Sequence, residues 1–128
     1  MATLKISELS VGDWVMVEWP DGERWRGRLT QLSVTGGVEV CCANGKHVRC
    51  SSSFISSIPI TAEILEKNGF EKICGMWYNS DTLMEFEQYK DGWCRTINCG
   101  EYSVYFIKYI HQLQHALRLA GVDKEINL

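Results

Sequence analysis

Short stretches of apolar and polar residues, separated by turn residues, fill the first sixty positions. Five of the six residues in 14–19 are apolar, which is typical of a buried strand. Turn chemistry at 20–23 and the hairpin dipeptide Asn44-Gly45 separate further stretches with strand character. We therefore expect strands at 14–19, 24–32, 37–42 and 47–50, with a short closing segment before Pro59. Closing so small a sheet into a barrel removes its free edges and buries one face.

The motifs at the start of this region have a known counterpart. A strand that begins Gly12-Asp13-Trp14-Val15, followed by a polar turn and the strand motif Trp25-Arg26-Gly27, resembles SH3-like barrels of the KOW and Tudor type. The resemblance covers roughly residues 10–58. It implies an SH3-like β-barrel over residues 1–60, and it implies no particular function.

The second half has a different pattern. Residues 61–68 predict a helix with Thr61 as its N-cap, and Gly69 with Phe70 predicts a Schellman cap against Leu65. Strands are expected at 72–78, 83–89, 93–98 and 102–107. A final helix is expected at 108–120, with the tail along a sheet edge. The predicted fold class is α+β: the barrel, followed by an α-β-β-β-α unit over 61–128 and packed with it as one compact body.

Two further stretches, 58–70 and 109–119, look like small uncharacterised proteins from phages and mobile elements of gut anaerobes. This resemblance implies an origin for the chain. It implies no mechanism.

Charge and composition narrow the classes of function. The chain of 128 residues has a formal net charge of −3, and acidic and basic residues balance over 1–60, so the excess acid lies in the second half. A protein that binds nucleic acid through its overall field is usually basic, so such binding here needs a local patch. No apolar run is long enough to span a bilayer and no secretory signal opens the chain, which predicts a cytoplasmic protein with reduced cysteines.

Three arginines form the most specific surface feature. Arg24, Arg26 and Arg28 alternate along one expected strand and so project from one face. Arg49 lies on a neighbouring hairpin, and Trp25 adds an aromatic side chain, a composition typical of binding surfaces. The alternative, which the sequence slightly favours, is that Trp19 and Trp25 fill the barrel while the arginines pair with Glu18, Glu23 and Glu39.

The final helix carries a second candidate set, Lys108, His111, His115 and Arg118. These residues follow one another on a stripe opposite the apolar one, which predicts a solvated basic face. The stripe is also a candidate binding face for an anion or an acidic partner. Two histidines four residues apart can share a metal, but the glutamate of a HExxH motif is missing.

The cysteines do not predict a zinc site. Cys41, Cys42, His47 and Cys50 lie close in sequence, but adjacent residues on a strand point to opposite faces. Core packing of Cys42 or Cys41 is the favoured interpretation.

The sequence therefore predicts a non-catalytic binding protein, with no cofactor, that holds a protein or a small anionic ligand. A nucleic-acid-binding barrel module is the first alternative. A metal-dependent hydrolase using the helix histidine pair is the second.

Overall fold

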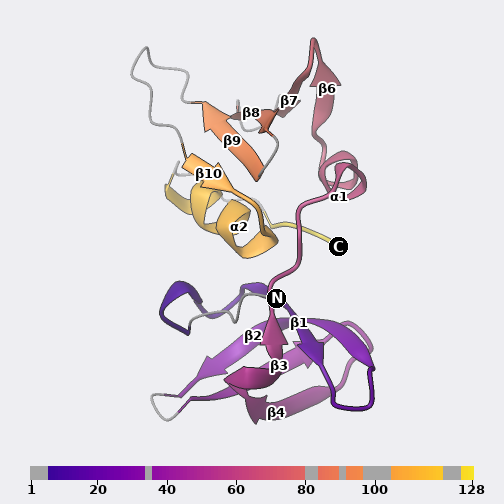
Figure 1. The fold of residues 1–128 in the computed structure, drawn as a ribbon, viewed down its shortest axis with the longest axis vertical. Coiled ribbons are helices and arrows are strands. Elements are labelled where there is room, and N and C mark those ends of the chain that lie inside the picture. Colours follow the sequence, from indigo (N-terminus) through magenta and orange to yellow (C-terminus); the bar gives the residue numbers. More distant parts are fainter. Residues whose placement is uncertain (1–5, 34–35, 80–83, 90–91, 97–104, 120–124) are drawn as a thin grey trace. The chain divides into compact units, whose positions relative to one another are not determined.

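The structure is a computed structural model, and it describes residues 6–33, 36–79, 84–89, 92–96, 105–119 and 125–128. The chain divides into two compact units, Met1–Ile58 and Pro59–Leu128. Each unit contains a five-stranded antiparallel sheet (Figure 1). The α+β prediction is confirmed. Within the described residues, no helix is long and apolar enough to cross a membrane.

The first unit is a meander of neighbouring strands. From β1 to β4 each strand pairs with the next in sequence, and β5 returns to the free side of β1, giving the order β4-β3-β2-β1-β5. A 3-10 turn joins β4 to β5. The elements are η1 (Ile6–Glu8), β1 (Trp14–Glu18), β2 (Arg24–Leu32), β3 (Gly37–Cys42), β4 (His47–Ser51), η2 (Ser52–Phe54) and β5 (Ile55–Ser56).

Two hairpins of this sheet use the same loop geometry. After β1, the backbone N–H of Trp19 donates to the Glu23 carbonyl at 2.9 Å, and Gly22 adopts a left-handed φ of 92°. The β3–β4 loop repeats this arrangement with Gly45 at φ 85°. A three-residue loop that ends in a left-handed glycine is a common hairpin connection. The turn predicted at Asn44-Gly45 is thus confirmed, with a longer loop than the two-residue form.

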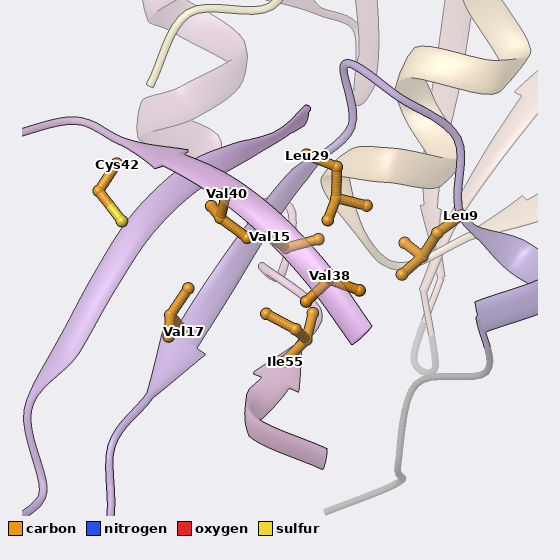
Figure 2. Packing of buried hydrophobic residues seen from close by; sticks show 8 residues of the cluster. All are labelled: Leu9, Val15, Val17, Leu29, Val38, Val40, Cys42 and Ile55. Carbon is orange, nitrogen blue, oxygen red and sulfur yellow. The ribbon is translucent and has the colours of Figure 1, made fainter. Parts of the chain in front are cut away.

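Strict alternation builds the core of the first unit. Along β1 and β3 every second residue is buried, and the buried side chains point toward one another (Figure 2). The cluster consists of Leu9, Val15, Val17, Leu29, Val38, Val40, Cys42 and Ile55.

Gly27 is buried on β2 at a position that has no room for a side chain. A Cβ atom at this position would lie 2.4 Å from Cγ1 of Val40 and 2.9 Å from the carbonyl oxygen of Cys41. The missing side chain therefore lets β2 and β3 approach each other across the core face.

The second unit places its strands in chain order, β10-β9-β8-β7-β6. Its first predicted strand, 72–78, is wrong in one respect: the chain turns back at Cys74 and Gly75, which have φ angles of 52° and 81°. Two successive positive φ values form a tight hairpin turn, so two strands replace one. The elements are α1 (Ala62–Lys67), β6 (Glu71–Ile73), β7 (Met76–Asn79), β8 (Met84–Tyr89), β9 (Gly92–Thr96), β10 (Tyr105–Ile107) and α2 (Ile110–Leu119). The five described strands fall on the four expected strand ranges, whereas the α-β-β-β-α pattern has three strands.

Helix α1 has the predicted ends. The Thr61 side-chain oxygen accepts the backbone N–H of Ile64 at 3.2 Å. At the other end Gly69 has φ 85°, and the Phe70 N–H donates to the Leu65 carbonyl at 3.0 Å. These bonds are the N-cap and the Schellman motif that the sequence indicates.

Helix α2 begins two residues later than predicted. Lys108 precedes the helix, and the side-chain oxygen of Gln112 accepts the backbone N–H groups of Lys108 and Tyr109 at 2.7 and 3.2 Å. Gln112 thus caps the start of α2, as a glutamine at the third helical position does in a capping box. The sequence also predicts a cap for this helix, formed by Gly121 and Val122 against Leu117, and Gly121 and Val122 lie outside the described residues.

One face of the second sheet is covered by both helices. Leu65 of α1, Phe86 of β8 and Leu113 of α2 line the same small internal space. The Phe70 and Phe86 rings pack in a tilted arrangement, with centroids 5.4 Å apart and an interplanar angle of 47°. All four side chains are buried, so the helices and the sheet share this core.

The described end of the chain is attached to α1. The buried Asn68 side chain donates to the Asn127 carbonyl and accepts the Asn127 N–H, both at 2.7 Å. The same amide donates to the Ile64 carbonyl at 2.7 Å, and Ile126 beside it is fully buried. The described tail residues therefore bond to the end of α1. The sequence had predicted that they lie along a sheet edge instead.

Candidate functional site

The outward side of β2 carries the three predicted arginines. Arg24 and Arg26 are exposed and Arg28 is half-buried, while Gly27 and Leu29 between and beyond them are buried. All three arginines therefore lie on the side of the sheet that faces away from the core, as the alternation predicts.

Each arginine has a different neighbour on β1. The register pairs Arg24 with Glu18, Arg26 with Met16 and Arg28 with Trp14. We call these six residues the arginine face.

The three arginines differ in the interactions that their guanidinium groups make. Arg24 forms an ion pair with Glu18 at 3.3 Å, although the Arg24 side chain is 60% exposed. The Arg28 guanidinium lies over the Trp14 ring, 4.7 Å from its centroid. Within the described residues, the Arg26 side chain has no ion pair and no hydrogen bond. Arg26 is thus the member of the row whose charge is left to solvent.

Arg49 extends the charged surface to β4. It pairs across the strands with Glu39, and its Nε lies 3.2 Å from a Glu39 carboxylate oxygen. The other oxygen of Glu39 lies 3.9 Å from Nδ1 of His47. Glu39 is therefore engaged by β4, and among the glutamates that the structure describes in the first unit, Glu18 is the one that forms an ion pair with β2.

A groove of about 630 Å³ opens beside Arg49, where β2 and β4 end and β3 begins. Its volume falls in the range of small-molecule sites, about 300–1,000 Å³. Val38 and Cys50 give it an apolar part, and Ser33 and Ser51 contribute polar groups.

Trp25 does not belong to the arginine face. It is half-buried and packs against the core cluster, with its ring 5.6 Å from that of Trp19 in an edge-to-face arrangement. Lys46 covers Trp25 with its ammonium 5.7 Å from the ring centroid. Trp25 therefore fills the interior side of the sheet, as the alternative interpretation holds. The aromatic residue beside the arginines is Trp14, which alternation with the buried Val15 and Val17 of β1 could have indicated.

The helix set divides between the surface and the core. Lys108 and Arg118 are exposed and His115 is half-buried, but His111 is only 1% exposed. The predicted solvated basic stripe is therefore wrong at His111. Its ring stacks on Tyr109 with centroids 6.0 Å apart and lies 5.9 Å from the His115 ring. The two imidazoles are brought together as their spacing predicts, but one of them lies inside the unit.

The described cysteines behave as core and surface residues. Cys42 is buried in the cluster, Cys41 points to the other side, and both carry free thiols, as predicted. Burial, together with the nearby Cys41, raises the pKa of the Cys42 thiol, and burial, together with Cys42, raises that of Cys50. A raised pKa keeps a thiol protonated at neutral pH, which makes both poor nucleophiles.

No trio of histidine, cysteine, aspartate or glutamate side chains in the described part of the chain is arranged to hold a metal.

Comparison with known proteins found no matching family model, no similar curated protein and no similar solved structure. Function is therefore inferred from the chain's own residues.

Proposed function

We propose that this protein is a non-catalytic binding protein that holds an anionic partner, a protein or a small anionic ligand, on its arginine face. The observation that carries the proposal is the outward row of three arginines, two of them exposed, in which Arg26 has no acidic partner among the described residues. Arginine presents a planar fork of donors that suits carboxylate and phosphate groups. A half-buried Trp14 beside the row adds the aromatic surface that binding sites favour.

The strand order of the first unit supports a proposal for its fold. A four-strand meander, a 3-10 turn and a short fifth strand returning to β1 have the strand order of SH3-like barrels. We propose that β1 to β5 form such a barrel, so that its outward side is a surface for binding. A cytoplasmic role in phage or mobile-element biology is part of the same proposal and rests on the sequence alone.

Nucleic acid is the second candidate partner for this surface, since Trp14 with Arg28 resembles the stacking platforms of single-strand binders. The hydrolase alternative is weaker. A metal shared by the helix histidines would need access for water and substrate, and His111 is 1% exposed.

The test is a chemical-shift titration of the isotope-labelled full chain with citrate, an oligoglutamate and an oligothymidylate. We expect the largest shifts at Arg24, Arg26, Arg28 and their β1 neighbours. Shifts confined to Lys108, His115 and Arg118 would move the site to α2, and no shift on β2 with any probe would contradict the proposal.

A charge-matched pair of variants serves as the control. Changing Arg24, Arg26 and Arg28 together to alanine should abolish the interaction, whereas changing Lys72, Lys108 and Arg118 to alanine removes the same charge and should not. The first variant should still fold, because an exposed ion pair is worth about 1 kcal/mol or less and a half-buried cation–π contact about 1–2 kcal/mol.

A further inference from the structure

We propose that the partner of the arginine face is an extended acidic segment of another protein, with carboxylates at alternate positions, anchored chiefly on Arg26. This inference rests on the proposed function and specifies the chemistry of its partner.

The spacing of the arginines sets the form of the partner. Residues 24, 26 and 28 lie on one side of a strand, and alternate residues of a strand are about 6.7 Å apart. An extended peptide repeats this spacing, so its alternate side chains can meet successive arginines. Carboxylates at positions i and i+2 fit this row, whereas adjacent carboxylates point in opposite directions.

The three arginines contribute unequally to such a contact. Arg24 already shares its charge with Glu18, and Arg28 is half-buried over Trp14. Arg26 is exposed, lies opposite the uncharged Met16, and has no acidic partner within the described residues. An incoming carboxylate therefore gains most at Arg26, where no existing interaction has to be given up.

The charges around the row favour a short partner over a long one. Three arginines and Glu18 leave a charge of +2 on the face. At the Arg24 end, the β1–β2 loop adds the exposed Asp21 and Glu23. A long, uniformly charged strand such as a nucleic acid would run from the arginines onto these carboxylates, and like charges repel. An acidic segment of a few residues avoids them.

The experiment compares two short peptides of identical composition, Thr-Glu-Thr-Glu-Thr and Thr-Glu-Glu-Thr-Thr, blocked at both ends. Each is titrated into the labelled full chain, and the shifts of the β1 and β2 amides give the dissociation constant. We expect the alternating peptide to bind several-fold more tightly. R26Q should weaken its binding about tenfold, the effect of one lost charge-assisted hydrogen bond.

Glu18→Gln supplies a variant with the opposite sign. It releases Arg24 from its ion pair, so we expect the alternating peptide to bind this variant more tightly than the unchanged protein. A variant that merely disturbed the fold would not gain affinity, and the amide spectrum of each variant reports its fold directly.

Three outcomes would overturn the inference. Equal affinity for the two peptides would remove the spacing argument. Tighter binding of an oligothymidylate of about eight nucleotides at the same amides would assign the face to nucleic acid, the second candidate partner. If neither peptide shifts the face, the inference fails, and the proposed function fails with it when citrate and the oligothymidylate also leave β2 unshifted.

Discussion

The buried amide of Asn68 offers the sharpest test of how the second unit is held together. Its side chain makes three hydrogen bonds, one to the Ile64 carbonyl and two to the backbone of Asn127. A hydrogen bond contributes about 1 kcal/mol net, and a buried group left without its partner costs more. The Ile64 carbonyl also accepts the backbone N–H of Asn68 at 3.2 Å, so it keeps one partner after the side chain is removed. We therefore expect Asn68→Ala to lower the free energy of unfolding by about 2–3 kcal/mol.

Asn127→Ala is the matched control, because Asn68 bonds only to backbone atoms of Asn127 and that residue is exposed. It should change the free energy of unfolding by less than about 0.5 kcal/mol. Asn68→Asp should cost more than Asn68→Ala at neutral pH, since a carboxylate would face two carbonyl oxygens. Its cost should shrink as the pH falls and the carboxyl group becomes a donor.

Urea unfolding of the three variants, followed by amide signals of α1 and of residues 125–128, measures these differences. If Asn68→Ala unfolds at the same urea concentration as the unchanged protein, or if Asn127→Ala is equally damaging, the side-chain pairing does not hold the tail. The role assigned to the Asn68 amide would then be wrong.

Three further predictions concern other parts of the chain. Gly27→Ala should lower the free energy of unfolding by about 1–3 kcal/mol, because its Cβ would meet Val40 and Cys41, and a thermal melt with unchanged stability would contradict the close strand contact. Cys74 has φ 52°, so Cys74→Asn should be neutral or slightly stabilising, whereas Cys74→Val should destabilise by about 1 kcal/mol; equal melting temperatures would refute the turn. Alkylation at pH 8 followed by peptide mapping should modify the exposed Cys74 well before Cys42, whose pKa is raised by burial, and Cys42 should gain reactivity only as the pH rises further; the reverse order would contradict its buried position.

Local signals in the sequence predicted the elements whose conformation depends on nearby residues. The N-cap at Thr61, the cap at Gly69 and the alternation of β2 each depend on contacts a few positions away. Such features can be recognised because backbone geometry restricts which residues fit.

The turn at Cys74 was not predicted because its residues give no clear turn signal. A two-residue hairpin usually has asparagine or aspartate before its glycine, and cysteine gives no such signal. The hydrophobic pattern of 72–78 is continuous across the turn, so it indicated a single strand.

Burial at the edge of an apolar stripe was harder to predict. His111 follows the buried Ile110 on α2, and its polarity assigned it to the solvent side. The fold buries His111 nevertheless. Its ring contacts with Tyr109 and His115 are local, whereas the extent to which other elements cover a side chain cannot be read from the period of the helix. One interpretation grouped Trp25 with Arg24 and Arg26, its neighbours in sequence. Adjacent residues of a strand lie on opposite sides of the sheet, so Trp25 faces the core while the two arginines face away from it.

The two hydrogen bonds between Asn68 and Asn127 also bear on the order in which the two units fold during synthesis. The first unit pairs neighbouring strands and is complete once β5 reaches β1, so it can form while later residues are still being added. In the second unit, the Asn68 amide at the end of α1 can bond Ile64 at once, but its two bonds to Asn127 form only when residue 127 arrives, 59 positions later. We therefore expect α1 to gain full protection from hydrogen exchange at the same moment as residues 125–128.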